Sequence, residues 1–129
     1  MKVEKYIRIP FRSHGRDFDG CDCYGLVRLF LKEELGKEIP DFWDYASADD
    51  GAVISSLIKE HKPAIAGKEK EIPDVGDVAL YKFRGYISHI GVYVGDGYIL
   101  HVLRGCDSVC VPAEHGILKG RLVGFYEVK

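Results

Sequence analysis

A cysteine at the expected start of an amphipathic helix constrains this chain more than any other feature. Asp22 precedes Cys23, and an aspartate there accepts hydrogen bonds from the free amides of a helix's first turn. Gly25 costs a helix about 1 kcal/mol relative to alanine, which indicates the close approach of another backbone or of a substrate. We expect a helix over 22–35 that ends at Gly36. The spacing i, i+3, i+4 and i+7 puts four side chains on its buried face: Cys23, Leu26, Val27 and Phe30.

The composition fits one globular domain over residues 1–129. Hydrophobic residues make up 47% and charged residues 29% of the chain, unlike a disordered protein. The net charge of -2 is too small to indicate binding to nucleic acid or capture by an anionic membrane. No apolar run approaches the ~20 residues of a membrane span. The first six residues lack the apolar core of a secretion signal, so we expect a protein made in the cytoplasm.

Helical patterns come first in the chain, and strand patterns follow. A second helix is expected over 48–61. Its apolar face consists of four residues: Val53, Ile54, Leu57 and Ile58. We expect an extended segment over 6–11 and loops over 12–20 and 62–74. Segments rich in β-branched and aromatic residues are expected to be strands: 78–83, 87–94, 98–103, 108–111 and 122–128. This order predicts an α+β protein, with N-terminal helices packed on a central antiparallel β-sheet.

Two histidines lie in neighbouring expected strands. If residues 95–97 form a three-residue hairpin connection, His89 lies diagonally across from His101 on one face of the sheet. Diagonal neighbours are about 7–8 Å apart at the backbone, within reach of long side chains. A two-residue connection would instead put the histidines on opposite faces. The expected pairs are Val94 with Tyr98 and Gly91 with His101.

Cys23 and the two histidines are the parts of a thiol nucleophile with its base. Helix amides favour the thiolate of Cys23, and its own backbone amide is a natural donor to an oxyanion. His89 would act as the base, and His101 would hold the ring of His89. The alternative is that Cys23 is a buried structural cysteine and that the histidines are satisfied groups of the sheet.

Several motifs along the chain together resemble a known family. They are Asp22-Cys23-x-Gly25-Leu26, Gly76-Asp77-Val78, Ser88-His89-Ile90-Gly91-Val92-Tyr93-Val94-Gly95 and Ile99-Leu100-His101. This set is similar to the NlpC-type cell-wall cysteine peptidases, from about Phe11 to the final strand. The resemblance implies a papain-like fold and cleavage of peptidoglycan stem peptides at the bond between γ-D-glutamate and a diamino acid.

The resemblance also implies roles for individual residues. Cys23 falls on the nucleophile, His89 on the base and His101 on the third polar residue of the family. Three further residues fall on or beside its substrate-binding positions: Asp22, Ser88 and Tyr24. The family usually has a tyrosine near the oxyanion, and Phe11 stands nearest that place here. A phenylalanine cannot donate that hydrogen bond.

A subtype is indicated as well. Gly15-Arg16-Asp17, the aromatic Tyr24 and Ile39-Pro40-Asp41-Phe42 resemble the phage tail-assembly branch. This implies phage tail proteins as partners, besides the peptidoglycan stem peptide, and a place in the virion tail, acting on the cell wall. Two other functions stay open: a non-catalytic tail-assembly module, and a thiol-dependent amidase or acyltransferase that acts on another amide.

The remaining cysteines, histidines and arginines carry weaker signals. We expect no metal or other cofactor. The alternative is a zinc site made of two cysteine pairs, Cys21 with Cys23 and Cys106 with Cys110. Histidines in loops and at a helix end are expected to be solvated: His14, His61 and His115. Three arginines are either ordinary surface charges or contacts for the carboxylates of a stem peptide: Arg16, Arg84 and Arg104.

Overall fold

A computed structural model describes residues 3–42 and 51–129 of the chain. Two α-helices lie in the first half, and most strands lie in the second. The helices are α1 (Cys23–Leu35) and α2 (Gly51–Ile65), with short 3-10 turns η1 (Glu4–Tyr6) and η2 (Gly116–Leu118). The strands are β1 (Arg16–Asp17), β2 (Gly20–Cys21), β3 (Ala66–Lys70), β4 (Val78–Phe83), β5 (Tyr86–Gly95), β6 (Tyr98–His101), β7 (Val109–Pro112) and β8 (Leu122–Val128).

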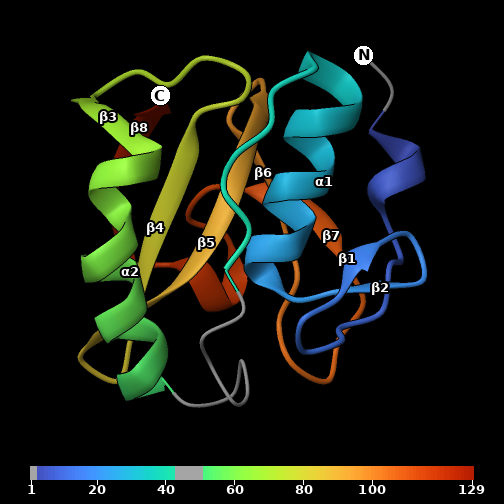
Figure 1. Ribbon diagram of the computed structural model, residues 1–129, viewed down its shortest axis with the longest axis horizontal. Coiled ribbons are helices and arrows are strands. Elements are labelled where there is room, and N and C mark those ends of the chain that lie inside the picture. The colour runs from blue at the N-terminus through green and yellow to red at the C-terminus, as the bar shows by residue number, and fades with distance from the viewer. Residues whose placement is uncertain (1–2, 43–50) are drawn as a thin grey trace.

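Six of the strands form one antiparallel sheet in the order β3-β8-β4-β5-β6-β7. Both helices cover the same face of this sheet, and the segment after α1 descends between them (Figure 1). A buried core joins Leu26 and Phe30 of α1 to Ile90 and Val92 of β5. The expected α+β architecture, with helices packed on an antiparallel sheet, is therefore confirmed.

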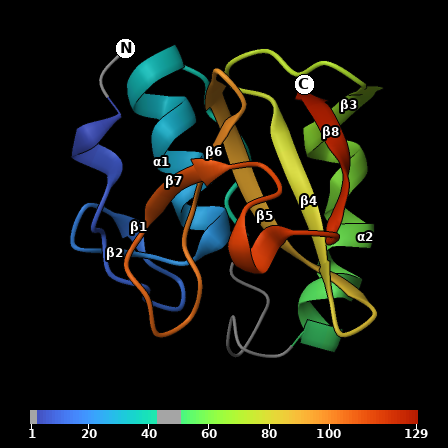
Figure 2. The same cartoon turned by 180° about the vertical axis from the view of Figure 1, so that it is seen from behind.

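The other face of the sheet has a smaller core. It is covered by the turn that carries η2, seen from behind in Figure 2, and Leu118 of this turn is fully buried. Ala79, Tyr81 and Ile99 join Leu118 in this second cluster. Successive residues of each strand thus alternate between the two cores.

The start and the end of α1 lie where the sequence predicts them. The Asp22 side chain accepts a hydrogen bond of 2.8 Å from the Gly25 amide and caps the helix. Gly36 ends it in the left-handed conformation, with φ of 62°. Leu26, Val27 and Phe30 are fully buried, and Cys23 packs against the same core, so the expected buried face is confirmed.

Residues 6–11 do not form the continuous extended segment that the sequence predicts. Tyr6 belongs to η1 and is fully buried, with its ring 5.2 Å from that of Phe30. Only isolated bridges follow, at Pro10 and Phe11. The expected loop over 12–20 contains the β1–β2 hairpin. Side-chain burial thus decides the path of this segment, which the β-rich composition alone cannot predict.

The prediction of a loop over 62–74 is wrong for the first half of that segment. α2 continues to Ile65, through Pro63, and β3 follows directly. β3 is an edge strand that pairs only with β8, so one side of it meets solvent and suits charged residues. Residues 48–50 of the expected second helix lie outside the described residues. Val53, expected on the apolar face, is 41% exposed.

The hairpin between β5 and β6 reaches the expected register by a different turn. Gly95 pairs with Tyr98, so the connection has two residues, Asp96 and Gly97, both with positive φ. The expected pairing of Val94 with Tyr98 is wrong. A bulge before Gly95 restores the pairing of Tyr93 with Ile99 and of Val92 with Leu100. It therefore compensates for the shorter turn and keeps the two histidines on one face.

Candidate active site

The two histidines of β5 and β6 meet as the register predicts. The Nε2 of His89 lies 3.0 Å from the Nδ1 of His101, and both side chains are buried. Gly91 makes room for this contact, because a Cβ there would lie 2.5 Å from Ile99 and 3.4 Å from the Cβ of His101. Tyr81 and Phe83 flank the ring of His89, with centroids 5.8 and 5.6 Å away.

The thiol of Cys23 lies against the backbone of β5. Its sulfur accepts hydrogen bonds from the amides of Ile90 and Tyr24. The Ile90 amide belongs to the peptide bond that joins His89 to Ile90, so the thiol touches the strand one residue from the histidine. Among the contacts of the described residues, no hydrogen bond joins this thiol to the imidazole of His89 or His101.

Burial favours the uncharged forms of the Cys23 thiol and of both imidazoles. Burial, followed by the Asp22 carboxylate, raises the pKa of the Cys23 thiol to about 12, against the two amide hydrogen bonds. Burial, with the charge of His101, lowers the pKa of His89 to about 3, and burial lowers that of His101 to about 4. Desolvation therefore works against the thiolate that the helix amides favour at this position.

An ion-pair cluster fixes the start of α1. The Arg16 guanidinium lies 2.8 Å from Oδ1 of Asp22 and 2.7 Å from Oδ1 of Asp41. It also donates to the carbonyl of Phe42 at 2.9 Å, and the His14 amide donates to Asp22. Arg16 is therefore neither a surface charge nor exposed to a substrate, whereas Arg84 and Arg104 are exposed.

A close backbone contact requires a glycine at position 25, in the first turn of α1. A Cβ on Gly25 would lie 1.9 Å from the carbonyl oxygen of Gly15, and a Cβ on Gly15 would lie 2.3 Å from that of Gly20. The expected approach of another backbone is thus confirmed. This contact packs the start of α1 against the β1–β2 hairpin.

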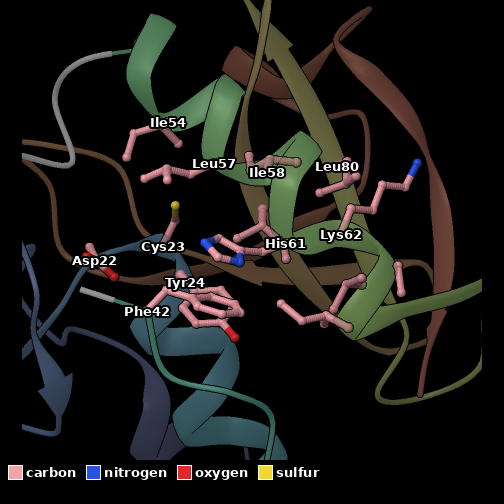
Figure 3. A pocket seen from close by; sticks show the side chains of 14 residues that line it. Asp22, Cys23, Tyr24, Phe42, Ile54, Leu57, Ile58, His61, Lys62 and Leu80 are labelled. Atoms are coloured by element: carbon pink, nitrogen blue, oxygen red, sulfur yellow. The ribbon is translucent and has the colours of Figure 1, made fainter. Parts of the chain in front are cut away.

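A cavity of about 90 Å³ opens beside Cys23, between α2 and the sheet. Figure 3 shows the sulfur of Cys23 pointing toward Ile54 and Leu57 of α2. His61, expected to be solvated, lines this cavity and stacks on Phe42 at 3.7 Å. The sequence reasoning missed these wall residues. The apolar period of α2 is the sequence signal for these residues, but on its own it predicts a core face and not a cavity wall.

The other candidates lie in varied surroundings. Ser88 of β5 is half-buried and lies beside the start of α2. A Cβ on Gly51 would lie 3.9 Å from its Oγ. Tyr24 lines the cavity and donates its hydroxyl to the Pro40 carbonyl. Phe11 packs against the core near Cys21. His115 is exposed, as expected.

Within the described residues, the cysteines form neither disulfides nor a metal cluster. All four cysteines are free thiols. Within residues 3–42 and 51–129, no group of three or more His, Cys, Asp or Glu side chains could hold a metal ion. No helix in those residues has the length and apolarity needed to cross a bilayer.

A helix that begins at a cysteine and packs on an antiparallel sheet bearing a buried histidine pair defines a papain-like α+β protein. The chain belongs to the NlpC/P60 family, which it matches over residues 8–126. No curated protein sequence matches the chain.

Solved structures show the same fold at low sequence identity. The NlpC/p60 domain of the peptidoglycan hydrolase SagA superposes with a TM-score of 0.65 at 17% identity, over 97% of this chain and 92% of that domain. An NLP/P60-family protein similar to lipoprotein, from Staphylococcus aureus, gives 0.64 at 16% identity, over 98% of this chain and 38% of its own. A family member from Bacillus cereus gives 0.65 at 19% identity, over 98% and 40%. The chain thus spans about two fifths of the latter two proteins.

Proposed function

We propose that this protein is a cysteine peptidase that hydrolyses amide bonds in peptidoglycan stem peptides. The observation that carries the proposal is the 3.0 Å contact between His89 and His101, at the strand residue whose neighbouring amide holds the Cys23 sulfur. Membership of the NlpC/P60 family and the fold shared with a peptidoglycan hydrolase domain support the choice of substrate.

The hydrogen bond between the histidines defines which nitrogen does the chemistry. For Nδ1 of His89 to accept a proton, its Nε2 must carry one and donate it to Nδ1 of His101. His101 then carries its own proton on Nε2. A positive charge that forms on His89 is stabilised by the same hydrogen bond, so His101 acts as a positioning residue.

The reaction then runs from a neutral pair. The Cys23 sulfur attacks the amide carbon as its proton passes to Nδ1 of His89, which later gives the proton to the leaving amine. Water hydrolyses the resulting thioester. The thiol–imidazole hydrogen bond forms with substrate bound, as catalytic hydrogen bonds often do. The Cys23 amide, in the first turn of α1, donates to the oxyanion.

Finer points of this function rest on the resemblance of the motifs. The bond between γ-D-glutamate and a diamino acid is the first one to test. Association with a phage tail, and a site of action at the cell wall after synthesis in the cytoplasm, are further parts of the proposal. The motif at Gly15-Arg16-Asp17 and the aromatic Tyr24 support the tail subtype.

Purified muropeptides provide the direct test. Wild-type protein should release peptide fragments that mass spectrometry identifies, and Cys23→Ala should release none while keeping its circular dichroism spectrum. Cys110→Ala is the matched control, because Cys110 is a half-buried cysteine of β7 outside the site. Absence of fragments from wild-type protein, or equal release by Cys23→Ala, contradicts the proposal.

A further inference from the structure

The cavity beside Cys23 has a chemistry that the proposed function does not require. Aliphatic side chains from α2, β4 and β5 form its walls, with Phe42 and Tyr24 at one side. The aliphatic lining includes Ile54, Leu57 and Ile58 of α2, Val78 and Leu80 of β4, and Ile90 of β5. Such a surface favours an uncharged alkyl group, because a charged group loses its hydration there.

Polar side chains at the rim are occupied by other partners. The Asp22 carboxylate binds the Gly25 amide and Arg16, and the Tyr24 hydroxyl donates to the Pro40 carbonyl. The Lys62 ammonium lies 4.1 Å from the ring centroid of Tyr126 and points away from Cys23 in Figure 3. These three groups therefore do not turn the cavity into a polar site, and the ring of His61, the fourth polar side chain of the lining, stacks on Phe42.

The orientation of the Cys23 thiol determines which part of a substrate would enter the cavity. Its sulfur points toward Ile54 and Leu57 (Figure 3), so a group bonded to the carbon that it attacks reaches the same apolar walls. The volume of about 90 Å³ holds roughly three groups the size of water. That corresponds to a short alkyl side chain.

We infer that this cavity is a specificity subsite for an uncharged alkyl group next to the scissile amide. The inference rests on the proposed function, since it assumes that Cys23 attacks an amide, and it narrows that function. Amides flanked by a short alkyl side chain should be cut faster than those whose flanking group carries a carboxylate close to the bond. A hydrophobic pocket discriminates by about tenfold or more for each methylene it binds.

Alkylation of Cys23 tests the subsite without relying on peptidase activity. N-butyl iodoacetamide, iodoacetamide and iodoacetate are compared by the rate at which each labels Cys23, read by peptide mass spectrometry. Cys106, which is exposed, serves as the reference thiol in the same molecule. Relative to Cys106, Cys23 should prefer the butyl reagent over iodoacetamide by about tenfold or more, and should disfavour iodoacetate.

Two variants on one helix separate the subsite from general effects. Leu57→Asn puts an amide into the cavity wall at similar volume and should bring the butyl preference to within about twofold of that at Cys106. Lys59→Asn, at an exposed position of the same helix, should leave the preference intact. Equal preferences at Cys23 and Cys106 in the wild type overturn the inference.

A peptide panel distinguishes failure of the subsite from failure of the proposed function. Stem-peptide amides with alkyl or carboxylate-bearing flanking groups are incubated with wild-type protein and with Cys23→Ala. Cleavage without preference, together with equal alkylation ratios, overturns the subsite and leaves the peptidase. No cleavage of any amide, with the butyl preference present, supports the subsite and contradicts the peptidase.

Discussion

Nε2 of His89 lies 3.0 Å from Nδ1 of His101, so one of these two nitrogens carries a proton and donates it to the other. In the proposed mechanism, His89 is the donor, which leaves its Nδ1 to accept the proton of the thiol. His101 would act through His89, because no hydrogen bond joins His101 to Cys23 among the described residues.

Substitutions of His101 should show whether it orients the ring of His89 through its hydrogen bond or only fills space. His101→Leu removes the acceptor for Nε2 of His89, and kcat should fall within the range of about 10²–10⁴-fold that a positioned base contributes. His101→Gln offers an amide oxygen to the same nitrogen and should recover part of kcat. Steady-state kinetics on a cleaved muropeptide measure both variants, and equal losses would show that the hydrogen bond does not matter.

The histidine pair should make the fold sensitive to acid. Both pKa values are lowered by burial, that of His89 to about 3 and that of His101 to about 4, while an unfolded histidine has a pKa of about 6.5. Between these values the unfolded chain binds more protons, so stability falls as the pH falls below about 6.5. The expected loss is up to about 1.4 kcal/mol per pH unit for each histidine.

Urea unfolding from about pH 7 to about pH 4.5 measures this slope. The double variant His89→Gln/His101→Gln should show a flatter profile. The exposed His115 provides the control, because His115→Gln should unfold with the wild-type slope. A wild-type profile that stays flat over this range is incompatible with two buried neutral imidazoles.

Alkylation of Cys23 should speed up with pH as the thiol ionises. Because burial raises the pKa of Cys23 to about 12, the thiolate fraction grows about tenfold per pH unit below that value. The rate at which iodoacetamide labels Cys23 should therefore climb steadily from about pH 6 to about pH 9. Site-resolved mass spectrometry follows the rate, and a plateau in this range would indicate a preformed thiolate–imidazolium pair instead.

The cluster around Arg16 should contribute strongly to stability. Arg16→Met removes the ion pair to Asp22, whose side chain is 2% exposed, and loss of one partner of a buried pair costs about 3–5 kcal/mol. The free energy of unfolding in urea should fall by that amount. Asp22→Asn in the same chain removes the uncompensated charge and should recover part of the loss, whereas additive losses would exclude direct coupling.

The elements whose bounds depend on residues close in sequence were predictable. The Asp22 cap, the Gly36 stop and the ends of β4 and β8 follow from capping chemistry and strand composition, and the structure has them where the sequence predicts them. Residues 6–11 and β3 depend on remote partners. The Tyr6 hydroxyl binds Glu34 at 2.6 Å, and β3 is defined by its pairing with β8.

In the site too, features set by nearby residues were predictable and features set by remote partners were not. The contact of His89 with His101 was predictable from strand alternation, although a bulge and a shorter turn produce the register. The raised pKa of the Cys23 thiol was not predictable, because burial of Cys23 depends on how α1 packs against β5. The stacking of His61 on Phe42 joins residues far apart in the chain, and no local pattern signals it.

Charged side chains lie along β3, the edge strand at one end of the sheet. Lys68 and Glu69 are exposed there. Unpaired edge strands invite other chains to extend the sheet, and lysines on the edge oppose such aggregation. The charged run on β3 should therefore keep concentrated solutions of the protein free of edge-to-edge polymers.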